Sequence, residues 1–285
     1  MILSPLRLTA MCTLWGALGL ALLALAPAPA GAEAAAKAES AVTQSVSEDQ
    51  EAVENLRDPE AMAELKRSLD FLAGLPRFQV TATMAYDVIQ ADGRRLQFEK
   101  QGEAYLQRPD RLSAVVRLDD GRQRQFWYDG KTLSIAEFSK KLHTQSKAPP
   151  TIDGMLDMLE GVFKDPMPLA DLFYNDLGPL QERPLEADIV GDAMVSGSLC
   201  TQLAFRGETV DWQMWVEKGE RPFIRKVVIS YREQPGIPQY LTWLNDWQTP
   251  AEFSDDRFRF AVPADSQWID LMLAAPQADT EGGQP

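Results

Sequence analysis

The chain has 285 residues and a formal net charge of -14 at pH 7, from 28 Lys and Arg against 42 Asp and Glu. So acidic a protein is poorly suited to nucleic acid or to anionic membrane surfaces, and neither is expected as a partner. Of its two cysteines, Cys12 lies in the N-terminal apolar run, which leaves Cys200 alone if that run is removed. An exported chain without a disulfide needs a core large enough to be stable by itself.

Residues 1–32 are typical of a secretory signal peptide. Arg7 is their only charge, an apolar run extends from Leu8 to Ala26, and Ala30-Gly31-Ala32 forms a small-residue cleavage site. We expect cleavage after Ala32. The alternative is an uncleaved membrane anchor, because the apolar run is about as long as a span requires. No later run approaches that length, so the mature chain is expected to have no stable membrane insertion.

A helix is predicted to follow a disordered leader. Residues 33–57 are rich in Ala, Ser, Glu and Gln and show little apolar periodicity. Asp58 is the expected N-cap, Pro59 the first helical residue, and Gly74 with Pro76 the end. The apolar residues at spacings of three and four are Met62, Leu65, Leu69 and Leu72. They form a stripe that must be buried.

Five strands are predicted next, because apolar and polar residues alternate. The segments are 78–88, 96–106, 112–118 and the two arms of a hairpin within Arg122–Phe138. In the hairpin, Asp129-Gly130 predicts a two-residue type I′ turn with Tyr128 opposite Lys131. Its apolar face then consists of Phe126, Tyr128, Leu133 and Ile135.

A helical insertion interrupts the strands. Pro149 and Pro150 break the alternation, and Thr151 is predicted to cap a helix that ends near Phe163, with one more turn over 169–174. Its apolar stripe is Ile152, Met155, Leu156, Leu159, Val162 and Phe163. The strands predicted after it are 189–190, 199–205, 210–216, 223–231, 240–247 and 257–262.

These elements predict a mainly β protein with helices (α+β). Residues 58–273 are expected to form a single curved antiparallel sheet of roughly ten or eleven strands, with a disordered tail over 274–285. The N-terminal helix and the helical insertion must cover its concave, apolar face. Two modest helices cannot easily fill so large a sheet, so a cavity is expected.

Structural roles are predicted for Cys200 and for the tryptophans of two strands. Cys200 is expected to be a small buried residue. Trp212 and Met214 are expected to share one face of a strand, and Trp243 and Trp247 one face of another. Core packing is favoured for these tryptophans over sugar or partner binding.

The order of the elements resembles a known superfamily. A leading helix, a meander with Trp127-Tyr128-Asp129-Gly130-Lys131, a helical plug, Trp247-Gln248 and Phe258–Asp265 are similar to the outer-membrane lipoprotein carrier (LolA-like) superfamily. Within it, the chain resembles a family of predicted bacterial periplasmic proteins with a domain of unknown function. The likeness covers about Pro59 to Trp268. It implies a periplasmic half-barrel, an incomplete β-barrel whose concave face holds acyl chains in the carriers and serves regulation in an envelope-stress sensor.

Signatures of catalysis and metal binding are missing from the sequence. His143 is the only histidine and is predicted to be a solvated strand-end residue, so zinc or iron sites built on His and Cys are not expected. There is no Gly-x-Ser-x-Gly elbow, Walker loop or dinucleotide fingerprint. Asp119-Asp120 and Asp255-Asp256 are ascribed to turn chemistry. We predict no catalytic residues, cofactor or metal; a hydrolase with two carboxylates facing one bond is the remaining alternative.

Non-catalytic binding of an apolar ligand is the predicted function. An acyl chain, lipid or lipidated peptide would be sheltered in the half-barrel, since each buried CH₂ contributes about 0.8 kcal/mol. The predicted cavity residues are Met84, Leu106, Val116, Phe126, Leu133 and Met214 in the wall and Met155, Leu159 and Phe163 in the lid. The alternative is an envelope regulatory or scaffolding module that binds a protein partner.

Overall fold

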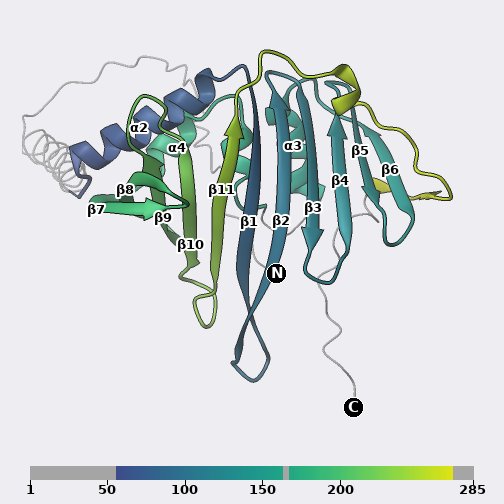
Figure 1. Cartoon of the computed structure of the whole chain (residues 1–285). Coiled ribbons are helices and arrows are strands. Elements are labelled where there is room, and N and C mark those ends of the chain that lie inside the picture. Colours follow the sequence, from purple (N-terminus) through teal and green to yellow (C-terminus); the bar gives the residue numbers. More distant parts are fainter. Residues whose placement is uncertain (1–55, 163–166, 272–285) are drawn as a thin grey trace, which may run out of the picture. The chain divides into compact units, whose positions relative to one another are not determined.

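The computed structural model describes residues 56–162 and 167–271 (Figure 1), which belong from residue 57 onward to one compact unit. The predicted signal peptide, nearly all of the leader, Phe163 and the C-terminal tail lie outside the described residues. Within the described ranges, no helix has the length and apolar character needed to cross a bilayer.

Twelve strands form one sheet in this part of the chain. They are β1 (Arg77–Ile89), β2 (Arg95–Gln107), β3 (Arg111–Leu118), β4 (Gln123–Tyr128), β5 (Thr132–Glu137), β6 (Leu142–Lys147), β7 (Glu186–Val195), β8 (Ser198–Arg206), β9 (Val210–Glu217), β10 (Ile224–Tyr231), β11 (Gln239–Gln248) and β12 (Gln267–Trp268). Their order is β12-β6-β5-β4-β3-β2-β1-β11-β10-β9-β8-β7, with β12 and β7 as the two edges. The sheet is therefore not closed into a barrel, as predicted, and it is antiparallel throughout except for the parallel β12–β6 pair.

Helices begin where the capping residues predicted them. The α2 helix (Pro59–Gly74) has Asp58 as its N-cap, whose carboxylate accepts a hydrogen bond from the backbone N–H of Glu60 at 2.8 Å. At the start of α3 (Ile152–Val162), Thr151 Oγ1 accepts from the backbone N–H of Gly154 at 3.2 Å. The predicted turn after α3 is η1 (Ala170–Phe173), and α4 (Gly178–Glu182) was not predicted.

The main core lies between the helices and one face of the sheet, called the concave face here. Its fully or nearly fully buried residues include Leu65, Leu69 and Leu72 of α2, Ile152, Met155 and Leu159 of α3, and Phe78, Leu106, Tyr128, Leu133 and Met214 of the sheet. Figure 1 shows α3 behind β2 and β3, and α2 contacts β7, β9 and α4. Both predicted covering helices are confirmed.

The predicted hairpin forms with a different register. Tyr128 pairs with Leu133, two positions further along than predicted. Only Gly130 of the Asp129-Gly130 pair has a positive φ, of 88°, so the turn is not type I′. Asp129 instead uses its carboxylate, which accepts from the backbone N–H groups of Lys131 and Thr132 at 3.0 and 2.8 Å and widens the loop. A shift of two residues keeps every side chain on its predicted face.

Residues 257–262 do not form the predicted strand. They belong to η2 (Asp255–Phe258) and an irregular segment whose rings pack onto the opposite, convex face of the sheet. Phe258 packs against Phe253, which contacts Tyr105 of β2 at 5.7 Å between ring centroids, and Phe260 contacts Trp127 of β4 at 5.1 Å. Residues 257–262 are therefore attached to the sheet by ring packing on its face and not by strand hydrogen bonds.

His143 is buried, so its predicted solvated position is wrong. It lies in β6, a strand that the weak alternation of Leu142–Lys147 did not reveal, and its side chain is 8% exposed. Phe260 covers it at 5.8 Å, and its Nδ1 atom lies 2.8 Å from Ser266 Oγ. The C-terminal segment that covers this face also supplies β12.

A bulge in β11 separates two tryptophans that were expected to share a face. Asp246 has a positive φ of 50°, and the pairing of β11 with β1 shifts there. Trp247 consequently packs against the main core, with its Nε1–H donating to the carbonyl of Ile224 at 3.0 Å. Trp243 stays on the convex face in a small cluster with Trp215. Trp212 and Met214 share a face, as predicted.

Candidate functional site

The concave face continues past the core that the helices cover. The strands β1 and β2 have 13 residues each, which spans about 43 Å, whereas the 11 residues of α3 span about 16 Å. Met84, Tyr86 and Phe98 lie on the concave face by strand alternation but do not belong to the helix-covered cluster. This extension of the sheet is the candidate site.

Small side chains line the sheet between α3 and this extension, and we call this region the concave floor. Its members on three adjacent strands are Ala82, Gly102, Ala104, Ala114 and Val116, with Met84 at its margin. All except Ala104 and Met84 are half-buried. A Cβ atom on Gly102 would lie 3.0 Å from Cε of Met84, so the Met84 side chain leans across the space that glycine leaves. The floor is apolar, and its short side chains extend less far from the sheet than the core side chains beside it.

Aromatic rings and one lysine stand beyond the floor, and we call them the Lys100 cluster: Tyr86, Phe98, Lys100 and Tyr240. Tyr86 and Phe98 stack with their ring centroids 5.9 Å apart. Lys100 Nζ lies 5.2 Å from the ring centroid of Tyr86 and 5.0 Å from that of Tyr240, within the range of cation–π attraction. Burial raises the pKa of Tyr240 far above its usual range, so its phenol stays neutral.

Arg124 and Glu137 form an ion pair on the concave face. Arg124, which pairs with Val116, donates to Oε2 of Glu137 through Nε at 3.1 Å and Nη2 at 2.7 Å. The two side chains are only 23% and 12% exposed. This ion pair adds no net charge to the site.

The structure brings most of the predicted cavity residues together. Leu106, Leu133, Met155, Leu159 and Met214 are buried in the same cluster between the helices and the sheet, with Phe126 packed against it. Val116 belongs to the concave floor, Met84 lies at its margin, and Phe163 is not described. Whether these residues line a ligand stays a prediction.

Sequence reasoning missed the Lys100 cluster, although a signal was present. On β2 the apolar positions alternate as Leu96, Phe98, Gly102, Ala104 and Leu106. Lys100 occupies the one position of this series that is not apolar. A partly buried charge needs compensating contacts, so a lysine in the apolar phase of a strand was the signal for this cluster.

The acidic pairs have structural partners. The carboxylate of Asp120 accepts from the backbone N–H of Arg122 at 2.9 Å, and this hydrogen bond lowers its pKa. Asp255 forms an ion pair with Arg111 at 2.8 Å, and Asp256 one with Arg259 at 3.0 Å. Among the described residues, no group of three or more His, Cys, Asp or Glu is arranged to hold a metal ion.

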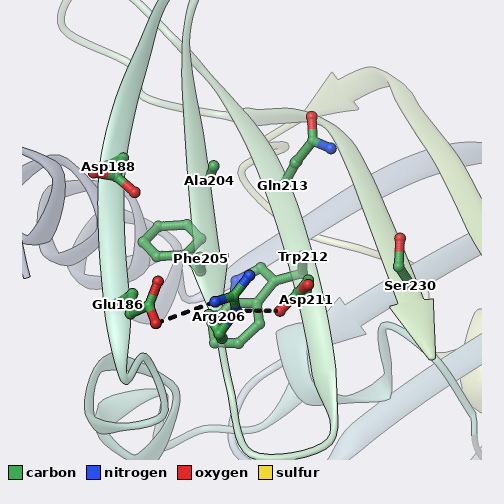
Figure 2. Close-up of a pocket in the computed structure, with 9 residues that line it drawn as sticks. All are labelled: Glu186, Asp188, Ala204, Phe205, Arg206, Asp211, Trp212, Gln213 and Ser230. Carbon is green, nitrogen blue, oxygen red and sulfur yellow. Dashed lines mark hydrogen bonds and ion pairs between the residues drawn. The ribbon is translucent and has the colours of Figure 1, made fainter. Parts of the chain in front are cut away.

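A shallow polar depression lies over β7, β8, β9 and β10 (Figure 2). Its lining residues are Glu186, Asp188, Ala204, Phe205, Arg206, Asp211, Trp212, Gln213 and Ser230. Arg206 joins Glu186 and Asp211 at 3.3 Å each, and the hydrogen bond to Asp211 raises its pKa. Arg206 thus pairs with two of the three carboxylates that line this depression, which is typical of a solvated strand surface.

An open sheet with two covering helices and an apolar concave floor defines a half-barrel, an incomplete barrel with two free edges. The family model for predicted periplasmic proteins (DUF2092) matches residues 61–272, and the chain belongs to this family. The protein is periplasmic, in agreement with the predicted export.

Several solved structures are similar to the chain. LprF from Mycobacterium bovis is 14% identical, with a TM-score of 0.45, over 70% of this chain and 98% of that one. The Mycobacterium tuberculosis lipoprotein LppX is 15% identical, with a TM-score of 0.42, over 68% and 98%. A putative outer membrane lipoprotein-sorting protein domain from Vibrio parahaemolyticus is 7% identical, with a TM-score of 0.31, over 70% and 96%. No curated protein matches the chain in sequence.

Proposed function

We propose that this periplasmic protein binds an apolar ligand, an acyl chain, a lipid or a lipidated peptide, on the concave floor and without catalysis. One observation carries the proposal: the concave face continues beyond the helix-covered core, and the small residues of the concave floor line the sheet at the margin of that core. Each CH₂ group that leaves water contributes about 0.8 kcal/mol, so a chain laid along the floor is retained in an aqueous compartment.

The position of α3 supports the same function. Its buried residues Met155 and Leu159 belong to the same core cluster as Ala104 and Leu106 of β2. Methionine is flexible and polarisable, and it adapts to apolar partners of varying shape. A ligand chain that slides under α3 would exchange contacts with these side chains without uncovering a charge.

Native mass spectrometry of the mature protein, purified from its periplasm, tests the proposal. We expect an adduct with the mass of a lipid, which disappears after delipidation and returns when a fatty acid is added. In Gly102→Leu the new side chain projects onto the floor, so the adduct should be lost. Gln101→Leu is the matched control, because Gln101 is exposed on the convex face one residue away.

The proposal would be refuted if the protein came from the periplasm without lipid and also bound no fatty acid after purification. If a pull-down from the same cells then recovered one envelope protein, with equal yield from Gly102→Leu and wild type, the regulatory alternative would be preferred.

A further inference from the structure

The strand β7 is an open edge of the sheet in the described part of the chain. It pairs with β8 on one side. On its other side Ala187 is covered, through a bridge to Arg57 and a hydrogen bond from the backbone N–H of Asp58 at 2.8 Å. Beyond a shift in its register, Gly191–Val195 pairs regularly with β8, and no described strand pairs with its outer side. Such an edge presents unpaired N–H and C=O groups to a further strand.

The opposite end of the sheet is covered by the chain itself. There β12 pairs with the start of β6, and the backbone N–H of Ile269 donates to the carbonyl of His143 at 2.9 Å. Figure 1 shows the C-terminal segment passing around this end of the sheet. Proteins commonly cover strand edges or place Pro or Lys on them, because these devices prevent pairing with other chains. The sequence of β7 contains neither residue type.

Exposed apolar side chains gather beside the open edge. Five of the twelve large apolar side chains that are exposed within the described ranges are Leu185, Ile189, Val190, Met194 and Leu199. Val190 and Met194 of β7 are 57% and 66% exposed. Apolar side chains that gather in one exposed patch are typical of an interaction surface. A strand laid along β7 would cover part of this patch.

Carboxylates give the edge a negative charge. Glu186 pairs with Arg206, and Asp192 pairs with Lys218. Asp188 lies further along β7 and lines the same depression as Arg206 (Figure 2). It is exposed and forms no ion pair with any residue that the structure describes. A basic side chain is therefore the complement of this edge.

A second copy of the chain does not suit the edge. Two β7 strands that paired with each other would bring the carboxylates of Asp188 and Asp192 from both copies into one interface. Like charges that face each other across strands are destabilising. The net charge of -14 opposes self-association as well.

We propose that the outer edge of β7 docks an extended, basic segment of a partner protein as an additional strand. The apolar side chains of this segment pack against Val190 and Met194, and one of its Lys or Arg side chains pairs with Asp188. In such strand addition, main-chain hydrogen bonds supply affinity and side-chain contacts supply specificity. The surface lies on β7 and not on the concave floor, so the inference does not depend on a bound lipid.

Three synthetic peptides test the inference with the full mature chain. In one peptide Val alternates with Lys, in the second Val alternates with Glu, and the third is the Lys peptide with a central Pro, which interrupts strand pairing. By fluorescence anisotropy, we expect the Lys peptide to bind on the order of ten-fold tighter than either of the others. Its binding should slow amide hydrogen exchange in Gly191–Val195.

Asp188→Lys should abolish the preference for the Lys peptide over the Glu peptide. Glu252→Lys is the matched control, because it makes the same change in net charge. Glu252 is exposed and precedes Phe253, whose ring packs on Tyr105 of β2 in the other half of the sheet. This variant should keep the preference.

The inference would be overturned if none of the peptides bound, if the Lys peptide bound no tighter than the Glu or Pro peptide, or if both variants lost the preference equally. It would also be overturned if the protein alone formed a dimer that protected Gly191–Val195 from exchange, because the edge would then belong to a second copy. None of these results affects the proposed binding of a lipid on the concave floor.

Discussion

Ala114 lies in the concave floor. Replacing it with a larger side chain tests whether this part of the face has room for a ligand or is already packed. It pairs with Ala104 and Phe126 and is half-buried. Replacement by Phe adds a ring above the floor. Extra volume in a packed core costs about 1–3 kcal/mol, because neighbouring side chains leave their rotamers. On a floor with room for a ligand, we expect Ala114→Phe to lower the free energy of unfolding by less than about 1 kcal/mol.

Ala187→Phe is the comparison in a site that is packed. Ala187 also lies on a strand, pairs with Phe205 and is fully buried in the core. Its replacement should lower the free energy of unfolding by about 1–3 kcal/mol. Urea denaturation of delipidated protein, with equal m-values, measures both changes. If Ala114→Phe is as destabilising as Ala187→Phe and leaves fatty-acid binding unchanged, the floor is part of the core and our argument for a ligand site is wrong.

Three further predictions concern local chemistry. Asp58→Ala should lower the free energy of unfolding by about 0.5–2 kcal/mol through loss of the N-cap, whereas Asp58→Asn should lose little; urea melts of both variants decide this. Burial raises the pKa of Cys200 to about 11, so a thiol reagent at about pH 8 should label it only after urea is added, and rapid labelling of native protein would contradict its buried position. Burial raises the pKa of Tyr128 from 10.0 to about 12. The stability that its neutral phenol contributes is therefore complete below about pH 10 and is lost as the pH rises through about 12. In alkaline melts over that interval, Tyr128→Phe should lose less stability than the wild type.

Much of the fold follows from alternation and caps. Asp58-Pro59 marks the start of α2, and strict alternation marks β1 to β3, because one face of each strand must be buried. The hairpin faces were predictable although its register was not, since the register depends on the carboxylate of Asp129 in the loop. A local pattern cannot reveal the bulge at Asp246, which comes from pairing with a strand distant in sequence.

The candidate site was predictable only in its apolar part. Residues such as Leu106, Met155 and Met214 follow from periodicity, and they meet in one cluster. Lys100 gave a signal as an exception within an apolar series, but its neighbour Tyr240 comes from β11 at the far side of β1. That contact depends on the strand order, which joins β1 to β11 across most of the chain.

The central claim, that a ligand lies on the concave floor, is tested most directly by a photoreactive fatty acid. The probe is added to delipidated protein, cross-linked, and located by peptide mapping. We predict labels in the peptides of β1 to β4, at Met84, Val116 or Phe126, and their loss in Gly102→Leu. Labels confined to the convex cluster around Trp215 and Trp243, or labelling that Gly102→Leu leaves unchanged, would contradict the account.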